Sequence, residues 1–300
     1  MENIVLLILC FSLGIFFRRI EKFPVNAHVS LNAFIIYVSL PATVLYYIHG
    51  LTLNPELIFL ALMPWIIFIL AFPFFLAAAR IFSFNRSTTG ALILTAGFGN
   101  TSFVGLPMIE AFFGKEFLGY GIVADQPGSF LALSTLGIMA AVRFSTGNIS
   151  PGQMTKRIVL FPPFVAIGAA LLLFSVPYPD WANTILLRLS DTLAPLALLS
   201  VGLQIRFRAI KGRVPPLLLG LFFKMVLAPA VIFILYSMIP GIKRDLFHIS
   251  IFEAAMAPMI TAGIVAADHD LDPELSALML GIGIPFSFLT LPVWYWFLLL

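Results

Sequence analysis

Charged residues are scarce in this sequence. Lys, Arg, Asp and Glu together make up 10% of the 300 residues, against about 25% in a typical soluble domain. Hydrophobic residues make up 61%, and the mean hydropathy is +1.05. This composition excludes a soluble fold and predicts that lipid surrounds the chain. The net charge of +3 comes from scattered residues, so no nucleic-acid partner is expected.

The sequence also lacks the residues that several other functions need. Its only cysteine, Cys10, excludes an intramolecular disulfide and a cysteine-based metal cluster. The four histidines show no metal-ligand spacing, and HExxH, GxSxG and P-loop patterns are absent. We therefore expect neither an enzyme nor a bound cofactor or metal. Without an ATP-binding loop, active transport has to use an ion gradient or the gradient of the solute.

Long apolar segments recur along the whole chain. A spanning helix needs about 20 predominantly apolar residues. The sequence predicts an all-α membrane protein with ten spans, at residues 4–17, 28–49, 57–79, 88–113, 117–142, 157–176, 181–205, 214–239, 245–267 and 273–299. The acidic residue Glu2 precedes the first run, and Arg18 and Arg19 follow it. This run is therefore predicted to be a retained span and not a cleaved signal peptide.

Basic residues divide unequally between the two sets of loops. The loops after spans one, three, five and seven hold twelve Lys and Arg, against three on the other face. The positive-inside rule places the first set in the cytoplasm. We therefore expect a multi-pass protein of the cell (inner) membrane with both termini outside the cytoplasm. The acidic loop at residues 268–274 should also be cytoplasmic, although it holds no Lys or Arg.

The two halves of the sequence resemble each other weakly. Three prolines of the first half have counterparts about half a chain later: Pro41 with Pro195, Pro73 with Pro229, and Pro107 with Pro258. Five spans in each half is an odd number, so the halves must be inverted in the membrane. The prediction is two inverted five-helix repeats, residues 1–144 and 156–300, joined by a cytoplasmic loop at residues 145–155. Chance placement of prolines, which are common in membrane helices, is the alternative.

The fourth and ninth spans are interrupted by small residues and proline. Residues 97–107 contain Asn100, Thr101, Ser102 and Pro107. Non-helical backbone survives at membrane depth only where protein or a hydrated cavity surrounds it. Paired interruptions of this kind indicate the binding site of a secondary transporter, with half-helix N-termini for an anion and freed carbonyls for a cation. A small-residue packing face is the alternative.

The ninth span carries the matching residues of the second half. Met256, Pro258 and Thr261 are predicted to line the same site, if the two interruptions cross. Glu253 precedes them and is a candidate for ion coupling or for simple exposure to water. We predict substrate binding by the polar residues and prolines of both interruptions.

Ionisable residues inside spans are costly and indicate function. Asp125, followed by Gln126 in span five, is a candidate for binding a proton or sodium. The alternative is a position near the outer interface or a cap of the broken helix. Lys224 in span eight either pairs with an acid or an anion, or extends toward an interface. Arg188 and Asp191 are three residues apart, which favours a structural ion pair between them.

The interrupted segments resemble those of the auxin efflux carrier family, within the bile acid, arsenite and auxin transporter superfamily. Residues 99–107 (GNTSFVGLP) resemble the family's first crossover, GNTxFxGLP. Residues 255–258 (AMAP) are similar to its second crossover, and residues 195–202 (PLALLSVG) to its seventh-helix pattern. Asp125 falls where members often carry an acid. The resemblance spans nearly the whole chain.

This resemblance implies ten helices in two inverted repeats, a scaffold and a transport subdomain, elevator-like movement and a homodimer. It also implies carboxylate substrates such as malate, malonate or auxin-like acids. The prediction is a secondary active transporter of small organic anions that works from within the lipid bilayer, with H+ or Na+ as coupling ion. The alternatives are a sodium-coupled symporter of the bile-acid type and a membrane ligand sensor that does not transport.

Overall fold

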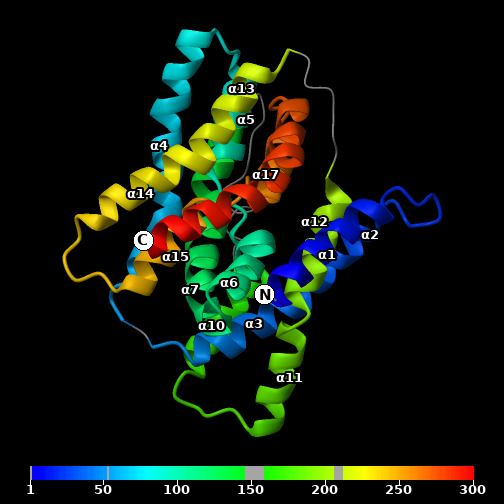
Figure 1. Ribbon diagram of the computed structural model, residues 1–300, viewed down its shortest axis with the longest axis vertical. Coiled ribbons are helices and arrows are strands. Elements are labelled where there is room, and N and C mark those ends of the chain that lie inside the picture. Colours follow the sequence, from blue (N-terminus) through cyan, green and yellow to red (C-terminus); the bar gives the residue numbers. More distant parts are fainter. Residues whose placement is uncertain (1, 53, 146–158, 206–211) are drawn as a thin grey trace. The chain divides into compact units, whose positions relative to one another are not determined.

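The computed structural model describes residues 2–52, 54–145, 159–205 and 212–300 (Figure 1). Its described part is helical and contains no strand beyond one isolated backbone bridge, between Gly99 and Pro258. Within the described residues, six helices are long and apolar enough to cross a membrane: Ala27–His49, Leu57–Phe82, Lys115–Phe144, Asp180–Gln204, Val214–Ser237 and Pro273–Leu299. Three shorter apolar helices accompany them: Ile4–Phe17, Thr101–Phe112 and Pro162–Leu172.

These helices confirm a multi-pass, all-helical membrane protein. The ten-span count and the inverted repeat stay predictions. Most of the predicted linker, residues 146–155, lies outside the described residues.

The chain divides into two compact units, and the predicted repeats, residues 1–144 and 156–300, stay a prediction. Unit 1 comprises Met1–Asn54, Ser102–Ile122 and Thr155–Ile205. Unit 2 comprises Pro55–Thr101, Val123–Met154 and Arg206–Leu300. Each unit therefore takes segments from both halves of the sequence.

Unit 1 is built around two pairs of helices. Its described elements are α1 (Glu2–Phe17), α2 (Ala27–Phe34), the π-helix η1 (Ile35–Ser39), α3 (Leu40–His49), α6 (Leu106–Phe112), the 3-10 helix η3 (Lys115–Phe117), α7 (Leu118–Val123), α10 (Pro162–Leu172), α11 (Asp180–Ser190) and α12 (Leu193–Gln204). Helix α1 lies along α12, as Figure 1 shows, and α3 packs against α10 and α11.

The α1–α12 contact depends on two facing glycines. A Cβ atom built on Gly202 would lie 2.3 Å from the carbonyl oxygen of Phe11, and one built on Gly14 would lie 2.3 Å from that of Leu199. Small residues let helix backbones approach this closely within a membrane. The two helices therefore pack backbone to backbone.

Hydroxyl groups join the end of η1 and the start of α3 to the break between α11 and α12. Ser39 and Thr192 share a hydrogen bond of 2.7 Å, and Thr43 and Ser190 share one of 3.0 Å. At the same break Asp191 forms an ion pair with Lys115 of η3. The predicted pair between Arg188 and Asp191 is therefore wrong, because the helix ends between these residues and turns the carboxylate toward another segment.

Unit 2 contains α4 (Leu57–Phe82), α5 (Arg86–Gly97), the π-helices η4 (Ala124–Phe130) and η5 (Leu133–Gly137), and α8 (Ile138–Phe144). It continues with α13 (Val214–Phe222), the π-helix η6 (Phe223–Leu227), α14 (Ala228–Ser237), α15 (Arg244–Ala254), α16 (Ile260–Asp268) and α17 (Pro273–Leu299). Helix α5 packs against α4, α8, α16 and α17, and its residues from Thr88 to Gly97 are buried. It is the central element of this unit.

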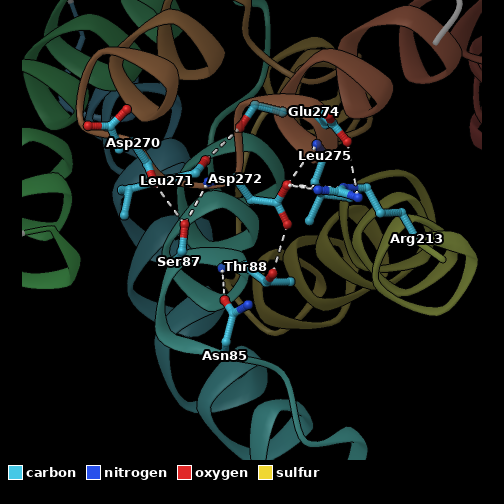
Figure 2. Close-up of polar contacts among 10 residues, drawn as sticks. Asn85, Ser87, Thr88, Arg213, Asp270, Leu271, Asp272, Glu274 and Leu275 are labelled. Carbon is cyan, nitrogen blue, oxygen red and sulfur yellow. Dashed lines mark hydrogen bonds and ion pairs between the residues drawn. The ribbon is translucent and has the colours of Figure 1, made fainter. Parts of the chain in front are cut away.

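Asp272 joins the starts of α5 and α17 to the residue before α13 (Figure 2). Its carboxylate accepts from the backbone N–H of Leu275, from the Thr88 hydroxyl and from the Arg213 guanidinium. Arg213 also pairs with Glu274 at 3.1 Å. The acidic loop at residues 268–274 thus supplies the N-cap of α17, and Asp272 takes a left-handed backbone conformation, with φ of 37°, to do so.

We expect Gly202→Ala to destabilise unit 1, because the added methyl group meets the backbone of α1. Overpacking of this kind costs about 1–3 kcal/mol. The measurement is the thermal unfolding midpoint of the purified protein. Gly168→Ala is the matched control, since a Cβ there meets nothing within 4 Å. Equal midpoints for the two variants would contradict the close helix contact.

We expect Asp272→Ala to lower the thermal unfolding midpoint as well. The change removes a helix cap and the partner of Arg213, and the loss of a cap alone costs about 1 kcal/mol. Asp268→Ala is the control, because this aspartate is exposed at the end of α16. Equal unfolding midpoints for the two variants would show that the hydrogen bonds and ion pair of Asp272 do not stabilise the fold.

Candidate functional site: the crossover in unit 2

The structure brings the two interrupted segments together within unit 2. Helix α5 ends at Gly97, and α15 ends at Ala254 before α16 begins at Ile260. The backbone N–H of Asn100 donates to the carbonyl of Ala257 at 2.8 Å, and that of Met259 donates to the carbonyl of Phe98 at 3.1 Å. Each non-helical segment thus forms hydrogen bonds with backbone groups of the other. Backbone N–H and C=O groups that are buried need such partners. We call residues 98–100 and 257–259 the crossover.

Lys224 reaches the crossover from η6, the π-helix between α13 and α14. Its side chain is 1% exposed. The Nζ atom donates to the carbonyl of Ala254 at 2.9 Å, and a Cβ atom on Gly99 would lie 3.0 Å from Nζ. The missing side chain at Gly99 therefore leaves room for the ammonium group. Lys224 does not extend toward an interface, which was one of its two predicted placements.

Asp125 lies buried beside the first break. It accepts a hydrogen bond from the Thr101 hydroxyl at 2.5 Å and another from the Gln126 amide at 2.6 Å. It belongs to η4, a π-helix that contains Pro127, and the Trp65 indole N–H donates to the Pro127 carbonyl at 3.0 Å. Donors to both oxygens stabilise the ionised carboxylate.

Glu253 lies in the last turn of α15, one residue before the helix ends at Ala254. The side chain is fully buried, and neither carboxyl oxygen has a hydrogen-bond partner among the described residues. Lys224 and Asp125 are close enough to act on it electrostatically. Two acids and one base thus lie near the crossover, with different hydrogen bonding at each acid.

The remaining predicted substrate residues occupy several positions. Met256 and Pro258 are buried in and beside the crossover. Thr261 is exposed in the first turn of α16. Ser102 and Pro107 fall in unit 1, with Pro107 in the first turn of α6 and not at the break itself.

Several residues of the site were not singled out from the sequence. Gly99 belongs to the quoted motif, but its role in admitting Lys224 depends on a residue far along the chain. Trp65 gave no signal that separates it from other residues of apolar spans. The described part of the chain contains no group of three or more His, Cys, Asp or Glu residues that could hold a metal ion.

The first turn of α16 has the character of an anion site. No side chain caps the helix, so its first backbone N–H groups lack that partner. These groups and the helix dipole favour a negative charge. Within one unit, the chain therefore combines a helix N-terminus, a buried ammonium group and hydroxyl and amide side chains.

The chain is similar to known membrane transporters along most of its length. The chain matches the family described as "Membrane transport protein" over residues 1–295. It is 28% identical to an uncharacterized transporter of Methanocaldococcus jannaschii, over 99% of this chain and 98% of the relative. It is 30% identical to an uncharacterized transporter of Methanothermobacter thermautotrophicus, over 69% of this chain and 67% of the relative. The chain therefore belongs to this membrane transport protein family, the auxin efflux carrier family that its motifs resemble.

Proposed function

We propose that this protein is a secondary active transporter of small organic anions. The observation that carries the proposal is the crossover, where two interrupted helices pair through their backbones beside the buried ammonium of Lys224. A protein that needed only to span the membrane would gain nothing from breaking two helices and burying a lysine between them. Transporters use such breaks to aim half-helix ends at a solute.

The chemistry of the site favours a carboxylate. Thr261 and the uncapped start of α16 offer a hydroxyl and backbone N–H groups to an anion. Asn100 and Thr101 add polar side chains at the other break, and Lys224 adds a positive charge. Met256 and Pro258 supply apolar surface for the carbon skeleton. Ser102 and Pro107 remain proposed substrate residues from the sequence. Malate, malonate and auxin-like acids have the required chemistry.

The two compact units support an elevator-type alternating-access mechanism. The crossover, Asp125, Lys224 and Glu253 all belong to unit 2, which we assign as the transport subdomain. Unit 1, with its closely packed glycine contact, is the proposed scaffold. We place the protein in the cell membrane as a homodimer, with both termini outside the cytoplasm. Gln126 accompanies Asp125 and Glu253 as a proposed coupling residue.

The first test is flux of radiolabelled malonate or malate into proteoliposomes that contain the purified protein. We expect Asn100→Ala to lower the flux about tenfold or more, because one hydrogen bond to a charged group contributes about 1.5–3 kcal/mol. Asn26→Ala is the matched control, since Asn26 is exposed and its side chain makes no cap bond. Binding of the acids without any flux would instead favour a membrane sensor.

The second test removes the buried charge. We expect Lys224→Met to lower malonate flux by about tenfold to 100-fold, because a hydrogen bond between a charged group and the bound anion contributes about 1.5–3 kcal/mol. Lys22→Met changes an exposed lysine and should leave the flux unchanged. Size-exclusion chromatography checks that the variants are folded. Full flux in a folded Lys224→Met variant would remove Lys224 from the proposed site.

A further inference from the structure

The two buried acids near the crossover differ in their hydrogen bonds. Asp125 receives donors on both oxygens, from Thr101 and Gln126. Glu253 receives none on either oxygen within the described part of the chain, although it is 0% exposed. An ionised carboxylate buried without a donor is very costly, whereas a protonated carboxyl group costs far less. The geometry therefore favours a charged Asp125 and a neutral Glu253.

The surroundings of Glu253 offer it little compensation for a negative charge. Its neighbours in the chain, Phe252 and Ala254, are fully buried. Lys224 acts on Glu253 electrostatically but directs its hydrogen bond to the carbonyl of Ala254. No ion pair joins Lys224 to Glu253 among the described residues. Asp125 also acts on Glu253, and its charge opposes a second negative charge nearby.

The other titratable groups of the surrounding helices are not among the charges that act on Glu253. Helix α15 packs against α14, α4 and α17. On α14, the Tyr236 hydroxyl donates to the Phe59 carbonyl. The remaining groups on these helices are Arg80 in the last turn of α4, Glu274 in the first turn of α17, Tyr295 of α17, and Arg244, Asp245 and His248 of α15 itself. Lys224 and Asp125 are therefore the charged groups that decide the state of Glu253.

We propose that the coupling ion is H+ and that Glu253 is the residue that binds it, an inference that rests on the proposed function. A proton from water on one side bonds to a carboxylate oxygen of Glu253, and the solute anion binds near Lys224. The unit then exposes the site to the other side, where the anion leaves and the proton returns to water. The bound anion favours the charged form of Lys224, and no bond within the solute changes.

This arrangement couples proton and anion binding through charge. With Glu253 neutral, the charges of Lys224 and Asp125 cancel, and one anionic carboxylate can enter. With Glu253 ionised, the site holds a net negative charge, which repels the anion. Each ligand thus raises the affinity for the other, as reciprocal coupling requires. The result is symport of one H+ with each solute anion, because Glu253 binds one proton.

The test uses proteoliposomes containing the full chain, with radiolabelled malonate as the probe. In sodium-free buffer, an acidic exterior should raise uptake by the wild-type protein. Glu253→Gln keeps the shape of a protonated glutamate, so its uptake should lose this response to the pH gradient. Glu253→Asp retains a titratable group and should keep the response at a lower rate. Glu21→Gln, at an exposed position, is the matched control.

Exchange of labelled for unlabelled malonate needs no imposed gradient and separates the two proposals. Exchange that is present but unaffected by pH, or uptake driven by sodium alone, would overturn the proton proposal and leave the transporter proposal standing. A pH response that persists in a folded Glu253→Gln variant would overturn it equally. Absence of exchange with any organic acid would count against the proposed function.

Infrared spectroscopy tests the proton on Glu253 without any transport. A protonated carboxyl group has a carbonyl stretching band that an ionised carboxylate lacks. We expect this band in the wild-type protein and in Glu21→Gln, and its loss in Glu253→Gln. Persistence of the whole band in Glu253→Gln, or its loss in Asp125→Asn instead, would show that Glu253 does not hold the proton.

Discussion

The antiparallel backbone pairing of residues 98–100 with residues 257–259 is the constraint on which the arrangement of unit 2 depends. A helix interrupted inside a membrane protein leaves N–H and C=O groups that lipid cannot satisfy. Here the two interruptions satisfy each other through the Asn100–Ala257 and Met259–Phe98 hydrogen bonds. Neither break is stable without the other, so the two segments must fold as a pair although they are far apart in sequence.

The crossover in turn explains the residue types around it. Phe98 stacks on Phe68 of α4 with ring centroids 4.3 Å apart, which anchors the end of α5 to α4. Gly99 has no side chain where Lys224 must pass. The lysine then supplies a donor to the Ala254 carbonyl, which the end of α15 leaves outside the regular helix pattern. Removing a carbonyl from helical pairing thus provides the partner that a buried ammonium needs.

The two units differ in the kind of residue that they bury. In unit 1 the stabilising features are close helix contact at Gly14 and Gly202 and paired hydroxyls between α3 and the α11–α12 break. In unit 2 the ionisable groups Asp125, Lys224 and Glu253 are buried. Buried charges are costly to stability. Folding gains nothing from burying three ionisable groups in one unit. Their presence in unit 2 is explained by a function that uses them.

The sequence by itself determined the fold class, the family and the position of both interruptions. These follow from local signals, namely apolar segment length, Gly and Pro within a span, and the motif at residues 99–107. Pattern alone also identified Asn100, Asp125 and Lys224 as candidates, because polar residues are conspicuous in apolar spans. It misassigned the partner of Asp191, since helix spacing indicated Arg188 and the helix ends before that pair can form. Only the tertiary structure decided that Lys224 bonds to Ala254, that Asp125 has two donors and that Glu253 has none. Those outcomes depend on which side chains of distant segments meet at a helix break, and no local pattern in the sequence encodes that meeting.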